Sequence, residues 1–147
     1  MTDIDRERAL QGLLARLAAE QGIPTIAAGD VEARAAGEPC LALLLTAAKS
    51  PESWDVGVVL PEVLRTCGGV RAVALEPAES AKLAARYGVD KYPSVVVLRE
   101  GRYTGVIEGM QDWEPFCTEL ARLAVAEPRR PPSLRIPIVT ESAARTA

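Results

Sequence analysis

The chain has 147 residues, the length of one typical domain, and its 48% hydrophobic and 25% charged residues are ordinary for a folded globular protein. It contains no histidine, which excludes the Ser-His-Asp triad, the Cys-His dyad and histidine-containing metal sites. A formal net charge of −3 argues against a nucleic-acid-binding protein, which normally carries a basic patch.

The first part of the chain begins with a helical pattern. Residues 3–21 carry leucines at helical spacing and predict a long N-terminal helix. A short strand is expected at 23–27, followed by a glycine-punctuated connection at 29–39. The continuous apolar run 41–46 predicts a central strand that is buried on both faces.

The middle of the chain repeats the strand and helix patterns. A polar loop at 49–55 leads into a helix expected at 54–67, with Ser53 or Asp55 as its N-cap. Pro61 lies inside that helix and should kink it, because proline has no N–H to donate. A second apolar strand at 70–75 and a short helix at 80–87 follow.

A hairpin and a final helix complete the pattern. The valine-rich strand 94–98 is joined to a returning strand, 102–107, by the tight turn Glu100-Gly101. The last helix is expected at 113–126, where Trp113 should pack against the body. The order of elements predicts an α/β fold with a mixed central sheet and helices on both faces.

The chain changes character after residue 126. Residues 127–147 hold four prolines and four arginines, so we expect a domain at 1–126 and a proline-rich C-terminal tail at 127–147. The tail has two interpretations. It is either a solvated extension or an extended arm that its apolar residues pin to the body or to a partner. A structural subunit tethered by this tail is one functional alternative.

The three cysteines, Cys40, Cys67 and Cys117, form no CxxC pair. Buried cysteine usually acts as a small hydrophobic residue, and we expect this role for all three. The alternative is a monothiol redox protein that uses Cys67 or Cys40. The cysteines are scattered, no secretory signal is visible, and no apolar run is long enough to cross a bilayer. We therefore expect a cytoplasmic protein without membrane insertion.

One segment resembles the thioredoxin-like fold. It is YGVDKYPSVVVLREGRYTGVIEG, residues 87–109, and it follows an apolar strand and a proline-containing helix. The resemblance implies a cis peptide bond before Pro93, which turns the Tyr92 backbone toward an extended peptide. Thioredoxins carry their redox cysteines at the position of residues 49–55, which here contain none. The fold is therefore expected without the disulfide chemistry.

A closer resemblance rests on four features: the length, the CxxC-less loop, the proline-bearing tail and the segment YPSVVVLREGRYTGVIEGMQDWEPF. In these features the chain is similar to hydrogenase expression/formation proteins of the HyaE, HupG and HoxO type. That resemblance implies a cytoplasmic chaperone, not an enzyme and without a cofactor, for an uptake [NiFe] hydrogenase. Its implied partners are the small-subunit precursor with its twin-arginine signal peptide, and other hydrogenase maturation proteins.

The predicted site combines the loop that replaces the redox motif with the Pro93 edge. An exposed tryptophan is a strong binding contact, and carboxylates can receive a pair of arginines through charge-assisted hydrogen bonds. Tryptophans and carboxylates are more often part of the core or of the solvated surface than part of a binding site. Both a structural role and a binding role therefore stay open for these residues. The candidate partner-binding residues are Glu52, Trp54, Asp55, Tyr92, Pro93, Glu108 and Gly109.

Overall fold

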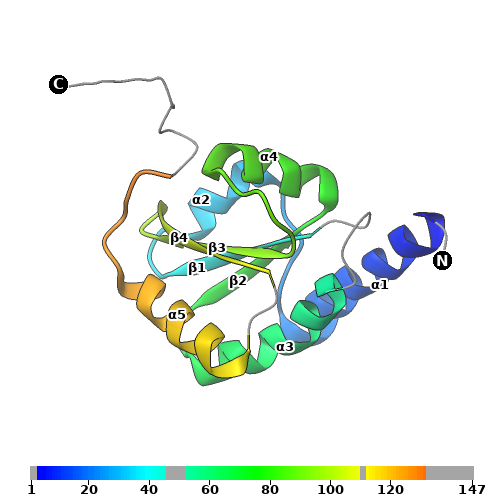
Figure 1. The fold of residues 1–147 in the computed structure, drawn as a ribbon, viewed down its shortest axis with the longest axis horizontal. Coiled ribbons are helices and arrows are strands. Elements are labelled where there is room, and N and C mark those ends of the chain that lie inside the picture. Colours follow the sequence, from blue (N-terminus) through cyan, green and yellow to red (C-terminus); the bar gives the residue numbers. More distant parts are fainter. Residues whose placement is uncertain (1–2, 46–51, 110–111, 132–147) are drawn as a thin grey trace.

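The computed structural model describes residues 3–45, 52–109 and 112–131. Within these ranges the structure has four strands and five α-helices (Figure 1). The strands are β1 (Cys40–Leu44), β2 (Arg71–Leu75), β3 (Ser94–Arg99) and β4 (Arg102–Glu108). The helices are α1 (Asp3–Gln21), α2 (Val31–Arg34), α3 (Glu52–Thr66), α4 (Pro77–Tyr87) and α5 (Trp113–Val125), with a short 3-10 helix, η1 (Ala28–Asp30), before α2.

The strands form one mixed sheet in the order β2-β1-β3-β4. Strand β1 is parallel to β2 and antiparallel to β3, and β3 and β4 form an antiparallel hairpin. Beyond β2, Thr25 forms an isolated parallel bridge with Ala74, so the short strand predicted at 23–27 is present as a single bridge. The mixed α/β sheet expected from the sequence is confirmed.

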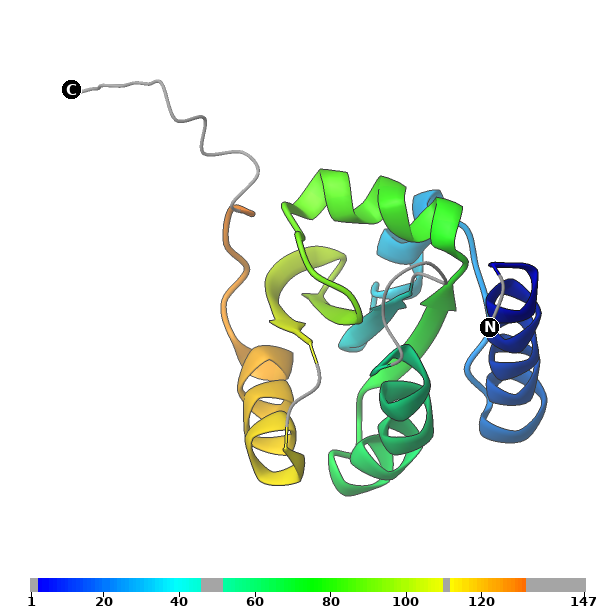
Figure 2. The ribbon, with the colours of Figure 1, turned by 45° about the vertical axis from the view of Figure 1, so that its right-hand side comes forward.

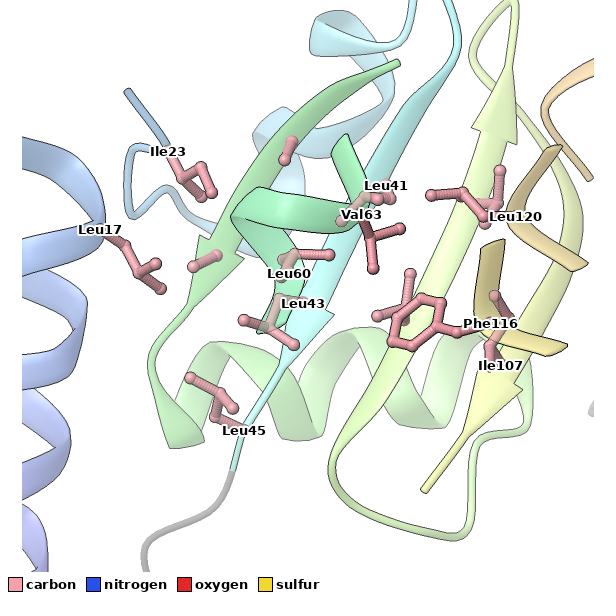
Figure 3. Close-up of a cluster of buried hydrophobic side chains, with 14 of the residues drawn as sticks. Leu17, Ile23, Leu41, Leu43, Leu45, Leu60, Val63, Ile107, Phe116 and Leu120 are labelled. Carbon is pink, nitrogen blue, oxygen red and sulfur yellow. The ribbon is translucent and has the colours of Figure 1, made fainter. Parts of the chain in front are cut away.

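Helices cover both faces of the sheet. Helices α1, α3 and α5 lie on one face, and α2 and α4 lie on the other (Figures 1 and 2). The first face is closed by leucines of α1, by Leu60 and Val63 of α3, and by Phe116 and Leu120 of α5, which meet Leu43 and its neighbours on the sheet (Figure 3). Burial of this apolar surface is the main force that holds the three layers together.

The opposite face has its own smaller core. Alternate residues of β1 and β3 point there and meet Val31 of α2 and Leu83 of α4. Because β1 is buried on both faces, its whole length is apolar, as the run 41–46 predicted. Thr46, the last residue of that predicted strand, lies outside the described residues.

Three predicted boundaries were wrong. The predicted connection 29–39 contains the last two residues of η1 and the one-turn helix α2, which are too short for helical periodicity to reveal. Helix α4 begins at Pro77 rather than at 80, because proline is accepted in a helix's first turn. Helix α3 begins at Glu52, so Ser53 and Asp55 lie inside it and cannot be its N-cap. The helix continues through Pro61, which is buried.

Candidate functional site

Three strands meet at one end of the sheet. Leu44, the last residue of β1, pairs with Ser94, the first residue of β3, and Ser94 also pairs with Glu108, the last residue of β4. Tyr92 and Pro93 immediately precede β3, and the peptide bond between them is cis, as the resemblance implied. The antiparallel register therefore brings this dipeptide to the end of β4.

Four of the seven predicted site residues lie together here. The Gly109 N–H donates a hydrogen bond to the Pro93 carbonyl at 2.7 Å, which joins the start of β3 to the residue after β4. Gly109 has a φ of +74°, a backbone conformation that favours glycine over residues with a side chain. The pairs Tyr92-Pro93 and Glu108-Gly109 thus form one small surface at the end of the β3–β4 hairpin.

Tyr92 is half-buried at this surface, whereas Pro93 is buried. Burial raises the pKa of the Tyr92 phenol, so the hydroxyl is neutral at neutral pH and can donate or accept a hydrogen bond. Within 3–45, 52–109 and 112–131, no hydrogen bond engages the backbone N–H or C=O of Tyr92. Both groups have the chemistry needed to pair with an extended peptide.

Acidic residues and one lysine lie close to the hairpin end along the sequence. Glu108 is half-buried, and its Oε2 accepts a long 3.5 Å hydrogen bond from the Asp90 N–H. Asp90 and Asp112 are exposed, and Asp112 makes no side-chain capping bond at the start of α5. Lys91, also exposed, is the neighbouring cation. The described contacts therefore place two acidic residues, Asp90 and Glu108, together at this edge.

The other three predicted residues are only partly described. Glu52, Trp54 and Asp55 lie in the first turn of α3, the helix that follows β1. Their side chains, and all of residues 46–51, lie outside the described part of the chain. Whether these side chains join Tyr92 and Glu108 therefore stays a prediction.

The region from α1 to α5 matches a known family. The model for "Hydrogenase-1 expression protein HyaE" matches residues 13–116, which is more than half of the chain. The chain belongs to the HyaE family. The match contains the whole sheet together with Tyr92, Pro93 and Glu108, so the thioredoxin-like fold and the hairpin surface both lie inside the family region.

Individual relatives of this HyaE-family protein carry related names. The hydrogenase expression/formation protein HoxO of Cupriavidus necator is 39% identical over 118 residues, covering 78% of this chain and 68% of the relative. HoxO of Azotobacter vinelandii is 28% identical over 130 residues, covering 87% and 86%. HupG of Rhizobium leguminosarum bv. viciae, also a hydrogenase expression/formation protein, is 38% identical over 93 residues, covering 60% and 62%. These names support a role in hydrogenase maturation.

Two of the three thiols of this HyaE-family protein, Cys40 and Cys67, have a raised pKa. Cys40 is buried in β1, and desolvation raises its thiol pKa to about 11. Burial, followed by the neighbouring Cys117, raises the pKa of Cys67 above its ordinary value of 9.0. Both groups are therefore mainly protonated at neutral pH, whereas the thiolate is the reactive form. The raised pKa values of Cys40 and Cys67 do not favour the monothiol alternative, which needs a low-pKa thiol.

Neither a metal-binding cluster nor a membrane-spanning helix is present among the described residues. Residues 3–45, 52–109 and 112–131 contain no cluster of three or more cysteine or acidic side chains that could hold a metal. No helix in those ranges is long and apolar enough to cross a membrane. A shallow hollow of about 350 Å³ beside Arg34 and Arg71 lies at the opposite end of β2 from the hairpin surface.

The Trp113 side chain does not make the contact that was expected from the sequence. We expected its indole to attach α5 to the body, but the side chain is 44% exposed at the first position of the helix. Phe116, three residues later, provides the buried contact instead. Trp113 is thus an exposed aromatic group that the sequence analysis did not place among the binding candidates, although its position directly after Asp112 was the available signal.

Proposed function

We propose that this protein is a redox-inactive chaperone that binds the small-subunit precursor of an uptake [NiFe] hydrogenase, its twin-arginine signal peptide, or both. Membership of the HyaE family supports the broader role in hydrogenase maturation. The proposal adds three points to that broader role: the identity of the partner, the absence of catalysis and a cytoplasmic location. Other hydrogenase maturation proteins are further partners in this proposal.

The observation that carries the proposal is the contact between the Pro93 carbonyl and the Gly109 N–H. That 2.7 Å bond places the Tyr92 backbone beside the end of β4, where Glu108 lies. An extended peptide would pair with the N–H and C=O of Tyr92, in the manner of an added strand. Arginines of the same peptide would meet the Glu108 carboxylate, since guanidinium and carboxylate groups form two parallel hydrogen bonds.

The chemistry of the cysteines supports binding without catalysis. Disulfide exchange requires a thiolate together with a second thiol that resolves the mixed disulfide. The loop at 49–55 contains no cysteine, and burial raises the pKa values of Cys40 and Cys67. The expected result in a disulfide-reductase assay is therefore no activity above that of the buffer.

The first experiment is a calorimetric titration of the full chain with a twin-arginine signal peptide from a hydrogenase small subunit. The control peptide has glutamine in place of both arginines. We expect saturable binding that weakens at least about tenfold in the control, since a hydrogen bond between charged groups contributes about 1.5–3 kcal/mol. Equal affinity for both peptides would overturn recognition of the arginine pair.

A charge variant of the protein tests the acidic surface. We expect weaker binding and a flatter salt dependence of binding in the variant that combines Glu52→Gln, Asp55→Asn and Glu108→Gln. The reason is that the charges that attract the peptide are removed. A matched control removes the same number of charges from exposed helix positions: Glu7→Gln, Glu20→Gln and Glu62→Gln. If the two triple variants bind alike, the proposed surface is wrong.

A further inference from the structure

Two cysteines that are fifty positions apart in sequence meet between α3 and α5. Cys67 directly follows the last residue of α3, and Cys117 lies in the second turn of α5. The Cys67 thiol donates a hydrogen bond to the Cys117 carbonyl, with 3.6 Å between sulfur and oxygen. The two helices lie side by side on one face of the sheet (Figure 2).

The backbone holds both residues in defined positions. The Cys67 N–H donates to the Val63 carbonyl at 2.8 Å, so Cys67 continues the last turn of α3. Cys117 follows Phe116, whose ring is anchored in the core. Both thiols pack at the margin of the core that these helices share, and both are partly exposed. Cys40, by contrast, is fully buried within a strand.

We propose that Cys67 and Cys117 are a redox modification site and form a reversible intramolecular disulfide that links the end of α3 to α5. The protein has the pair in its reduced form in this structure, where both thiols are free. Rotation about the Cα–Cβ bonds is the movement that would turn the two sulfurs toward each other. This proposal stands apart from the partner-binding role: there the protein is redox-inactive because it does not catalyse disulfide exchange on other proteins, whereas this disulfide forms within its own chain.

The oxidant is a low-molecular-weight disulfide of the glutathione class. The Cys67 thiolate attacks one sulfur of that disulfide, the S–S bond breaks, and one small thiolate leaves with the bonding electrons and takes up a proton. The Cys117 thiolate then attacks the Cys67 sulfur and releases the second small thiol. The protein loses two protons and two electrons, and the oxidant gains both and becomes two thiols.

The local environment determines the rate of this exchange. Burial and the adjacent Cys117 sulfur raise the pKa of Cys67, so little thiolate exists at neutral pH. The reaction should therefore be slow at neutral pH and faster as pH rises toward that pKa. A slow, non-catalytic thiol pair of this kind is a modification site rather than the active centre of a reductase.

A disulfide between these residues would also constrain the chain. The closed loop would contain β2, α4, β3 and β4, and a long closed loop restricts the unfolded chain most. We expect the oxidised protein to have a Tm higher by on the order of 10 °C than the reduced protein. The same treatment should not shift the Tm of a Cys117→Ser variant.

The test uses the full chain, treated with oxidised glutathione and then denatured and alkylated. We expect one alkylated cysteine, Cys40, instead of three, and a disulfide-linked peptide pair containing Cys67 and Cys117. Dithiothreitol should restore all three thiols. The linked peptide is measured on the wild-type chain, so the result does not depend on whether a variant folds.

Variants provide the matched controls. Cys67→Ser and Cys117→Ser should each prevent the linkage, whereas Cys40→Ala should retain it, because Cys40 lies inside β1. Recovery of three alkylated cysteines would overturn the proposal. Stable glutathione adducts without a linked pair, or disulfides only between separate chains, would overturn it as well.

Discussion

The Ser80 hydroxyl accepts a hydrogen bond from the Leu45 N–H at 3.0 Å and donates one to the Leu75 carbonyl at 3.1 Å. Ser80 is fully buried at the start of α4, and its two partners lie at the carboxyl ends of β1 and β2. One side chain therefore joins three elements just where the chain leaves β1 toward α3. This contact positions the end of the sheet that carries the proposed binding surface.

Ser80→Ala should destabilise the protein by about 1–3 kcal/mol, because it leaves the Leu45 N–H and the Leu75 carbonyl buried without a side-chain partner. Urea unfolding followed by circular dichroism measures this change. The signal peptide should also bind to the Ser80→Ala variant more weakly than to the wild-type protein, since the end of β1 loses its fixed position.

Thr66→Ala is the control for loss of a hydroxyl. Thr66 donates to the Glu62 carbonyl of its own helix but is exposed, so its loss should change the unfolding free energy by less than about 0.5 kcal/mol. An equal effect at Ser80 and Thr66 would show that the buried contact contributes little.

Gly105 allows α5 to approach β4 closely. A Cβ at this position would lie 2.5 Å from Leu123 Cδ2, and the Leu123 side chain is buried and has little room to move. Gly105→Ala should therefore destabilise the fold by about 1–3 kcal/mol through overpacking. Thermal and urea unfolding measure the loss.

Two further variants separate overpacking from the general effect of glycine replacement. A Cβ at Gly68 meets no atom within 4 Å, so Gly68→Ala should be nearly neutral. Combining Gly105→Ala with Leu123→Ala should cost less than the sum of the single changes, because the smaller side chain removes the clash. Additive losses would exclude this contact as the cause.

The sequence predicted the sheet well because β1, β2 and β3 are distinct apolar runs and a tight turn joins β3 to β4. Four of the five strand predictions differ from the structure by one or two residues at their ends, within the described ranges, and the fifth, 23–27, is present only as the Thr25 bridge. The hairpin turn lies at Glu100-Gly101 as expected. Glu100 itself has a positive φ of 55°, an uncommon conformation for a non-glycine residue. The placement of Tyr92-Pro93 beside Glu108-Gly109 follows directly from this hairpin.

Contacts between distant elements were not predictable in the same way. Helical periodicity indicates which face of a helix is buried, but it does not identify the residue on another helix that the face meets. The pair Cys67 and Cys117 and the Ser80 bridge therefore emerge only from the tertiary structure. Trp113 was expected to attach α5 to the body, but it is 44% exposed, whereas Phe116 is buried.

Glu79 gives the protein a pH-dependent contact. Its carboxylate binds the Lys82 ammonium group at 2.9 Å and accepts a hydrogen bond from the Ala28 N–H at 2.8 Å. Both contacts lower the pKa of Glu79 below its ordinary 4.5, and the contact with Lys82 has the larger effect. A lowered folded-state pKa stabilises the protein above the ordinary pKa, and this stabilisation is lost as pH falls through the lowered value.

Glu79→Gln should therefore be less stable than wild type at neutral pH, and the difference should narrow as the solution is acidified below 4.5. Unfolding free energies measured across this pH range test the expectation. Glu100→Gln, an exposed position in the hairpin turn, provides the control for loss of one charge. A stability difference that stays constant with pH would argue against the carboxylate contact.

The segment after α5 follows the outer edge of the sheet. The Arg129 N–H donates to the Tyr103 carbonyl of β4 at 2.9 Å, and the Arg99 guanidinium donates to the Ala126 carbonyl at 3.2 Å. Pro131 is buried. A hydrogen bond to an edge strand satisfies a backbone group that would otherwise be open to pairing with another chain. The division at residue 126 between domain and tail stays a prediction.

Two shortened chains test the contribution of this segment. A chain that ends at residue 131 keeps the Arg129–Tyr103 bond, and a chain that ends at 126 loses it together with the burial of Pro131. We expect the shorter chain to fold but to be less stable by about 1–2 kcal/mol, the contribution of one hydrogen bond and a small apolar contact. It should also self-associate more at high concentration, because the edge of β4 is uncovered. Urea unfolding and light scattering measure the two effects. Equal stability and equal association of the two chains would mean that residues 127–131 do not protect the sheet edge.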